Sequence, residues 1–373
     1  MSRIAVISDV HVGNHKAHGG KIAAGVNARC WLALNALRDA IDYAKNEGCS
    51  SLVITGDLID YSRPEAQILS VLQEILGTAR DDGLSTILIV GDHEFVSTAH
   101  GDHALGPLEP VATIIASPQV VEIDGTINLV CIPYAPDPAV ERIPRVMDAL
   151  LGSGSHGQKR KRVLVLHSGI TNNESPPWLR AKSSSLPIDF VERIVDQWSL
   201  ELVVAGDFHK RRDWSSDGRM IYQVGALVPT GWDNPGLEDY GSLFIYDSSS
   251  ENVTMREVLG PRFVFSHMDN AKLLSAARAY KGQVFLRLQA SSDRMTEALG
   301  FRGELLDDVV VAVDIVPDRN EAEACARTAA MATRSQQTLD DALAAYVSEM
   351  KLDEGVDRDA VLNRAREYLA RKS

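Results

Sequence analysis

Short runs of consecutive apolar residues alternate with helix-like segments through the first two thirds of the chain. Turn residues follow each run, a pattern typical of strands that are buried on both faces of a sheet. Between the runs, apolar side chains recur at helical spacing from Trp31 to Ala44 and from Ile68 to Leu76. This alternation predicts βαβ units whose strands cover 3–8, 51–55, 86–90, 163–167 and 202–205.

Other β-rich segments are separated by polar turns such as DSSSEN, residues 247–252. They favour hairpin strands, at 120–133, 219–224, 241–247 and 252–258. Together with the βαβ units, these hairpins predict a mixed α/β sandwich that forms one domain over residues 1–262.

The last third of the chain changes character. Two strand-like runs, at 283–290 and 308–316, precede three helical segments near 320–333, 338–351 and 357–371. The middle segment has an apolar face, formed by Leu339, Ala342, Leu343, Tyr346, Val347 and Met350. We therefore expect a smaller α+β domain over 263–333 and a helical tail over 334–373.

Composition excludes several classes of protein. The chain has 373 residues, of which 45% are apolar and 24% charged, as in an ordinary globular protein. With 38 Lys and Arg against 51 Asp and Glu, a formal charge of −13 excludes a wholly basic nucleic-acid coat protein but not a local basic groove. The four cysteines have no paired spacing, which favours a reducing compartment. No run approaches the ~18 apolar residues of a membrane span, so we expect a cytoplasmic protein with no membrane partner.

Asp and His side chains follow five of the predicted buried strands, in the motifs SDVH, GDLID, GDHE, LHSG and GDFH. A single Gly-Asp after a strand is more often a turn or a helix cap than a ligand. Five such endings in order, with glycines nearby that let the backbone bend sharply, indicate one shared site at the carboxyl ends of the strands. Asp and His without Cys suit divalent ions such as manganese, magnesium or iron.

This ordered set resembles the calcineurin-like metallophosphoesterase superfamily, over residues 4–210. The resemblance implies a four-layer α/β/β/α sandwich that binds two divalent metal ions. It also implies the metal ligands: Asp9, His11 and His209 for the first ion, Asp57 as a bridge, and Asp92, His167 and Asp207 for the second. Two cations about 3.5–4 Å apart activate a water and stabilise charge on a phosphate. His93 is the candidate for contacting the phosphate and protonating the leaving oxygen, its alternative being a structural histidine.

Two ligand positions depart from the superfamily pattern. Asp92 stands where the pattern has Asn, and Asp207 stands where it has the first His of Gly-His-x-His. Both remain oxygen ligands, but they double the number of ligand carboxylates and so weaken the metals as Lewis acids. We expect an oxygen-preferring second site that favours Mn²⁺, accepts Mg²⁺ and disfavours Zn²⁺.

Within the superfamily, the chain is most similar to SbcD-type DNA repair and recombination nucleases, especially the short versions of bacteriophages. The likeness rests on the long connection after the first strand, on the IYQVGALVP block after GDFHKRRDW, and on the C-terminal α+β region. It implies a DNA exo- and endonuclease in which 263–333 caps the DNA and the tail docks on an SbcC-type coiled-coil ATPase. A homodimer is one further assembly to consider.

Basic and aromatic side chains near the motifs are candidate DNA contacts. They are Lys210, Arg211 and Arg212 directly after His209, Trp178 and Arg180 in the loop after His167, and His15 in a Gly-rich loop. The alternative for each is an ordinary surface residue, and contact with DNA or phosphate is favoured for 210–212, at the expected rim of the site. Two other functions stay open: hydrolysis of small phosphodiesters or phosphomonoesters, and a catalytically weak scaffold that binds DNA or the ATPase.

Overall fold

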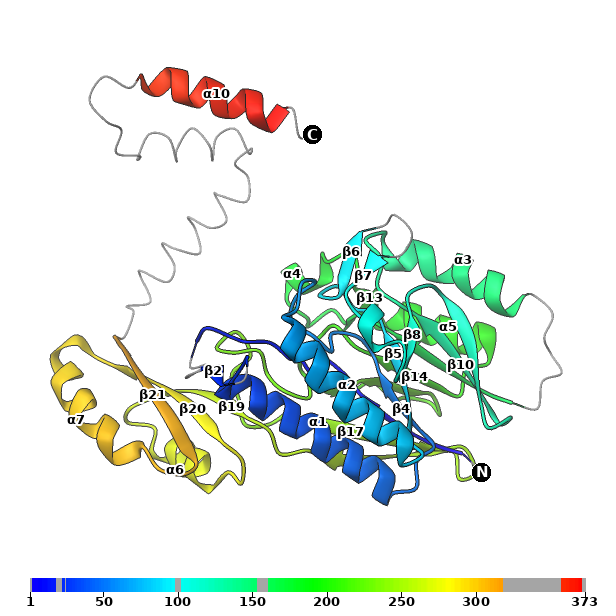
Figure 1. Ribbon diagram of the computed structural model, residues 1–373, viewed down its shortest axis with the longest axis horizontal. Helices are drawn as coiled ribbons and strands as arrows, with labels where there is room; N and C mark the ends of the chain where they lie inside the picture. The colour runs from blue at the N-terminus through cyan, green and yellow to red at the C-terminus, as the bar shows by residue number, and fades with distance from the viewer. Residues whose placement is uncertain are drawn as a thin grey trace. The chain divides into compact units, whose positions relative to one another are not determined.

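The computed structural model describes residues 2–17, 22–23, 25–97, 102–152, 160–317 and 357–370. Two six-stranded sheets form the centre of the fold (Figure 1). The first has the order β18–β17–β1–β4–β5–β8, with β1, β4, β5 and β8 parallel and β17 antiparallel to both of its neighbours. Its strands are β1 (Arg3–Ile7), β4 (Ser51–Ile54), β5 (Ser85–Ile89), β8 (Thr113–Ile115), β17 (Ser242–Asp247) and β18 (Asn252–Glu257).

The second sheet has the order β15–β16–β14–β11–β10–β9. Its four inner strands are parallel and both edge strands are antiparallel. The strands are β9 (Gln119–Ile123), β10 (Ile127–Ile132), β11 (Lys161–Leu166), β14 (Leu202–Ala205), β15 (Arg212–Asp213) and β16 (Met220–Gln223). Because parallel strands end at the same edge, the loops after β10, β11 and β14 lie together.

Alternate side chains along the strands build three apolar layers. One face of each sheet contributes to a core between the sheets, for example Val6 and Val53 opposite Val165 and Val204. The other face of the first sheet packs on α1 (Ala28–Asn46) and α2 (Ala66–Asp81). The other face of the second sheet packs on α3 (Ala139–Leu151) and α5 (Ile188–Trp198). The predicted four-layer α/β/β/α sandwich is confirmed.

The strands begin and end within a few residues of the predicted positions, since their apolar runs are buried on both faces. No helix is predicted from the sequence at α3 or α5, and both are present. Pro144 lies inside α3, where a proline normally indicates a helix end. The remaining short elements of the sandwich are β2 (Ile22–Ala23), β3 (Val26–Asn27), β6 (Phe95–Ser97), β7 (Asp102–His103), η1 (Gly106–Leu108), β12 (Ile170–Thr171), α4 (Pro177–Arg180) and β13 (Leu186–Pro187).

A small three-stranded sheet follows, in the order β19–β20–β21. Its elements are β19 (Arg262–His267), α6 (Ala271–Ala279), β20 (Val284–Ala290), η2 (Ser292–Arg294), α7 (Met295–Leu305) and β21 (Val310–Pro317). The chain divides into two compact units, one of residues 1–289 with 296–316 and the other of 290–295 with 317–373. The domain limits expected at 262 and 333 stay predictions.

The helical tail is described only in part. The helix α10 (Arg358–Ala370) is present, close to the predicted 357–371. The helices predicted near 320–333 and 338–351, with the apolar face of the second one, lie outside the described residues. No helix among the described ranges is long and apolar enough to cross a membrane.

Candidate metal centre

The structure brings the seven predicted metal ligands together at one edge of the two sheets. Each lies just beyond the carboxyl end of a strand: Asp9 and His11 after β1, Asp57 after β4, Asp92 after β5, His167 after β11, and Asp207 and His209 after β14. Their ligand atoms form overlapping groups in which all atoms lie within 4.8 Å of one another. Two of these groups are Asp9–His11–His209 and Asp92–His167–Asp207.

Asp57 lies between these two groups. Its Oδ2 is 3.7 Å from His11 Nε2, and its Oδ1 is 3.5 Å from His167 Nε2. Its side chain is only 2% exposed. One carboxylate oxygen therefore faces each group, which is the arrangement that a bridging ligand requires.

The donor set fits divalent cations. Asp9 Oδ1 is buried and has no hydrogen-bond partner among the described residues, although buried carboxylate oxygens are normally paired. The Nε2 atoms of His11 and His209 converge to 3.1 Å. His167 Nδ1 lies 2.7 Å from the carbonyl oxygen of Thr55, to which it donates, and this bond turns its Nε2 toward the cluster, 3.0 Å from Asp92 Oδ1. A cation at each group would satisfy these atoms.

The carboxylates around His11 favour positive charge on its imidazole. Burial opposes protonation of His11, yet Asp60 and Asp9 raise its pKa to about 10. Burial would raise the pKa of Asp9, but His11 and His167 lower it to about 2. Positive charge is therefore strongly favoured here, which is the condition for binding cations.

The backbone is strained at four of the seven ligands. The backbone φ angle lies between 49° and 76° at Asp9, His11, Asp57 and Asp207. This is the left-handed region, which residues other than glycine rarely adopt. Such conformations cost about 1–3 kcal/mol each and cluster at functional sites. No local pattern in the sequence predicts them.

The glycines of the Gly-Asp motifs act mainly through size. A Cβ at Gly91 would lie 2.1 Å from Asp57 Oδ1, and a Cβ at Gly56 would lie 2.1 Å from His167 Nδ1. Only Gly56 has a positive φ, of 106°. At Gly91, which has no positive φ, the close approach of the Asp57 carboxylate is the physical reason for glycine.

A buried glutamate that sequence reasoning missed fixes the loops of the cluster. Glu94, 0% exposed, accepts hydrogen bonds from the backbone N–H groups of Gly91 (2.8 Å), Asp57 (3.0 Å) and Ile59 (3.0 Å). Burial, and then Asp57, raises the pKa of Glu94 to about 7. The GDHE motif contains this residue, but only the fold shows that it binds the neighbouring loop.

Replacing Glu94 with alanine is expected to destabilise the protein by about 3 kcal/mol, because three buried N–H groups lose their acceptor. Chemical denaturation with circular dichroism measures this change. Glu174→Ala, at an exposed loop position, serves as the control and should unfold like the unchanged protein. An unaltered midpoint for Glu94→Ala would mean that these hydrogen bonds do not hold the loops.

His93 lies beside the cluster with one ring nitrogen fixed. Its Nδ1 is 2.5 Å from the carbonyl oxygen of Asp60, to which it donates. Its Nε2 is 4.0 Å from Asp57 Oδ2, and the side chain is 37% exposed. The ring is thus oriented by the protein and open to solvent, as a group that contacts a substrate must be.

Asp60, which is not among the predicted site residues, lies behind two histidines. Its Oδ1 is 3.3 Å from His11 Nδ1, and its Oδ2 is 3.3 Å from His15 Nδ1. The ring of His15 also approaches the His11 carbonyl oxygen, at 3.1 Å. Such outer contacts orient ligating imidazoles, so His15 borders the cluster through Asp60 and His11.

Asp207 has partners on both of its oxygens. Ser184 Oγ donates to Oδ2 (2.6 Å), and Lys182 Nζ donates to Oδ1 (3.3 Å). The Lys182 ammonium also lies 5.5 Å from the centre of the Phe208 ring. Lys182 and Ser184 belong to the loop after His167, whereas Phe208 lies in the GDFH motif after β14.

The predicted DNA contacts fall into two kinds. Lys210, Arg212, Trp178 and Arg180 are exposed, Trp178 at 67%. Arg211 is instead half-buried, with its Nη1 3.3 Å from Ser242 Oγ. Lys161 and Arg162 begin β11, at the end of the strand opposite the cluster, and Lys161 pairs with Glu201 and Glu251.

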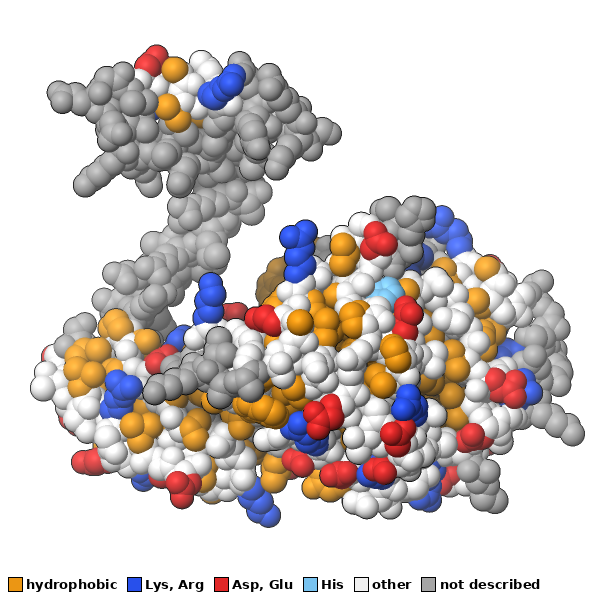
Figure 2. All heavy atoms as spheres, in the orientation of Figure 1, with side chains coloured by type: hydrophobic (Ala, Val, Ile, Leu, Met, Phe, Trp, Pro, Cys, Tyr) orange, Lys and Arg blue, Asp and Glu red, His pale blue; other side chains and the backbone are white. Residues whose placement is uncertain are grey.

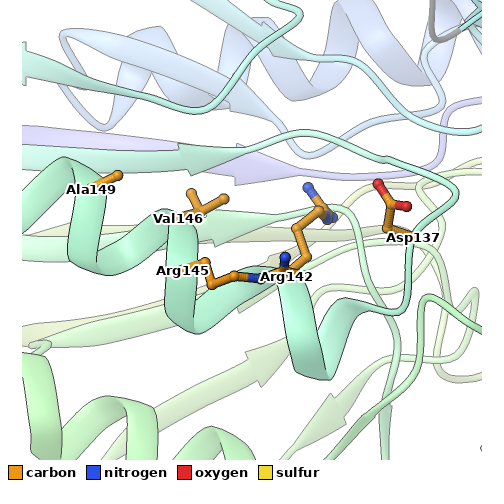
Figure 3. Close-up of a pocket in the computed structure, with 5 residues that line it drawn as sticks. All are labelled: Asp137, Arg142, Arg145, Val146 and Ala149. Atoms are coloured by element: carbon orange, nitrogen blue, oxygen red, sulfur yellow. The ribbon is translucent and has the colours of Figure 1, made fainter.

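A shallow cleft of about 350 Å³ lies along α3 (Figure 3), lined by Asp137, Arg142, Arg145, Val146 and Ala149. Arg142 donates to the carbonyl oxygen of Pro133 (3.2 Å), in the loop after β10. The first N–H of α3, at Ala139, donates to the Ser183 carbonyl oxygen (2.8 Å). The cleft therefore begins at the same edge as the cluster. On the face of the described residues that Figure 2 shows, acidic and basic side chains are interspersed.

Comparisons with known proteins agree with this geometry. A family model described as "Calcineurin-like phosphoesterase" matches residues 2–211. Over 227 residues the chain is 25% identical to the DNA double-strand break repair protein Mre11 of Sulfurisphaera tokodaii, covering 60% of this chain and 53% of the relative. The chain thus spans about half the length of that curated relative. A crystal structure of a 5′-nucleotidase from Staphylococcus aureus aligns with a TM-score of 0.41 and 12% identity over 69% of this chain and 53% of that one, too low to support any conclusion.

Proposed function

The chain belongs to the calcineurin-like phosphoesterase family, and from this premise we propose that it is a two-metal phosphodiesterase that cleaves DNA in recombination or repair. The single observation that carries the chemistry is the convergence of seven Asp and His side chains from five strand ends, with Asp57 between two groups of ligands. Family membership establishes a metal-dependent phosphoester hydrolase; the DNA substrate is our proposal.

Each residue has a role that follows from its position. Asp9, His11 and His209 would hold one divalent ion, Asp92, His167 and Asp207 the other, with Asp57 shared. When bound, the ions supply a water of lowered pKa and neutralise charge on the phosphate oxygens. His93 Nε2, fixed through Nδ1 and open to solvent, hydrogen-bonds a phosphate oxygen and donates the proton to the leaving oxygen.

Two observations favour DNA over a small phosphoester. The similarity to a DNA repair protein extends over 227 residues, 60% of this chain. In addition, exposed Trp178, Arg180 and Lys210 offer a stacking surface and cations for a nucleic-acid strand. The cleft along α3, which contains Arg142 and Arg145, would add further cations for the phosphate backbone of the DNA.

The assembly follows from the same resemblance. Residues 263–333 act as a DNA-capping domain, and residues 334–373 dock on an SbcC-type coiled-coil ATPase. A homodimer of the chain would place two such clusters on one DNA. Purifying the chain with such an ATPase, with and without residues 334–373, tests the docking role: loss of the complex on truncation supports it.

Degradation of end-labelled DNA, compared with hydrolysis of bis(p-nitrophenyl) phosphate, tests the substrate class. We expect metal-dependent conversion of DNA to short products, with the chromogenic diester cleaved far more slowly. The reverse order of rates would assign the chain to small phosphoesters. Binding of DNA or the ATPase without hydrolysis of either substrate would indicate a scaffold.

Manganese is expected to support the highest rate, with magnesium lower and zinc about tenfold or more below manganese, because the second group offers two carboxylates and one imidazole. Titrating each metal into chelator-treated protein and following DNA degradation measures this order. Excess chelator should abolish activity, and adding Mn²⁺ back should restore it. A zinc optimum would contradict the oxygen-preferring second group.

A further inference from the structure

The two ligand groups of the cluster differ in the hydrogen bonds and ion pairs that their carboxylates make with other side chains. In the Asp9–His11–His209 group, Asp9 Oδ1 is buried and has no hydrogen-bond partner among the described residues. In the Asp92–His167–Asp207 group, both oxygens of Asp207 are occupied, by Lys182 at Oδ1 and by Ser184 at Oδ2. Asp9 thus keeps one oxygen available for a cation, while its Oδ2 accepts a hydrogen bond from the neutral Ser8 hydroxyl. At Asp207 a cation meets an ammonium group instead.

Lys182 is held in this position by its own loop. Its N–H donates to the Leu179 carbonyl oxygen (3.2 Å), and its carbonyl oxygen accepts from Ser185 N–H (3.0 Å). Its side chain lies against the Phe208 ring and is still 44% exposed. The backbone thus directs the ammonium toward Asp207, while the exposed end leaves it room to move into solvent.

The charge of Lys182 acts on more than one ligand. Lys182 Nζ lies 3.3 Å from Asp207 Oδ1, and its ammonium also interacts electrostatically with Asp92 and Asp57. It therefore offsets part of the negative charge that the two additional carboxylates, Asp92 and Asp207, add.

We propose that Lys182 is an internal competitor for the second metal ion: its ammonium balances Asp207 and Asp92 and sets the metal concentration at which the Asp92–His167–Asp207 group fills. The inference rests on the proposed two-metal function. It makes the two sites unequal, so that the Asp9–His11–His209 group fills first. Binding of the second ion displaces the ammonium from Asp207 Oδ1.

Isothermal titration of Mn²⁺ alone into the full metal-free chain tests this directly. The unchanged protein should bind in two steps of different affinity. Lys182→Met, which keeps the apolar stem, should tighten the weaker step about tenfold, because a unit charge beside the ligand is removed. Lys182→Arg should stay near the original affinity. Lys161→Met, which removes another lysine that is paired with carboxylates, should change neither step.

The outcomes separate this inference from the proposed function. Thermal unfolding shows whether Lys182→Met folds normally. If it does not, Lys182→Gln is a second uncharged variant, and it should tighten the weaker Mn²⁺ binding step in the same way. Two binding steps that neither variant alters would overturn the role of Lys182 and leave the two-metal function standing. If neither the unchanged chain nor any variant showed a second Mn²⁺ binding step, both the role of Lys182 and the two-metal function would be overturned.

Discussion

Replacing His93 with alanine should lower manganese-dependent DNA degradation about 10³-fold, within the range for loss of a general acid. The physical reason is that His93 Nε2 is oriented by the Nδ1 bond to the Asp60 carbonyl oxygen and is open to substrate. Single-turnover digestion of end-labelled DNA with saturating Mn²⁺ measures the effect on the chemical step.

Two controls make that result specific. Mn²⁺ binding by His93→Ala should be close to that of the unchanged protein, because His93 belongs to neither expected ligand group. His103→Ala, which removes an imidazole from the same connection after β5, should digest DNA at the original rate. Equal digestion by His93→Ala and the unchanged chain would show that this histidine does not take part in the reaction.

Asp57→Asn is expected to have a larger effect, a loss of about 10⁴-fold or more in rate, because one substitution removes charge from both ligand groups. The two oxygens of Asp57 face His11 and His167 at 3.7 and 3.5 Å. Asparagine is the suitable replacement, since it tolerates the left-handed backbone at this position, where φ is 53°. The folded structure should therefore persist while the bound metal is lost.

Metal content after dialysis, measured by mass spectrometry, together with the rate of DNA digestion, checks this expectation. The matched control is Asp124→Asn, an exposed aspartate that also has a positive φ, of 46°. It should retain metal and activity. Full metal content in Asp57→Asn would rule out a bridging role for this carboxylate, whatever happened to the rate.

The positions of the strands could be predicted because they depend on local features of the chain, and the ligand set could be predicted because its five motifs resemble those of a known superfamily. Buried parallel strands require continuous apolar runs, and such runs at 51–55 and 202–205 correspond to β4 and β14. Parallel strands of one sheet also end at the same edge, so Asp57 and Asp92, which follow β4 and β5, had to lie near each other. The same holds for His167 and Asp207, which follow β11 and β14 of the second sheet. Helix α3 was missed, because a proline within it resembles a helix end.

The amino-acid sequence by itself determined the sandwich, the edge where the chemistry lies and the seven candidate ligands. Only the tertiary structure decided how those ligands are held and charged. Glu94 accepts a hydrogen bond from the backbone of a loop more than 30 positions away. Lys182 and Ser184, in a separate loop, donate hydrogen bonds to Asp207. Such contacts depend on how loops from different strands meet, and apolar periodicity, which describes one segment at a time, carries no information about them.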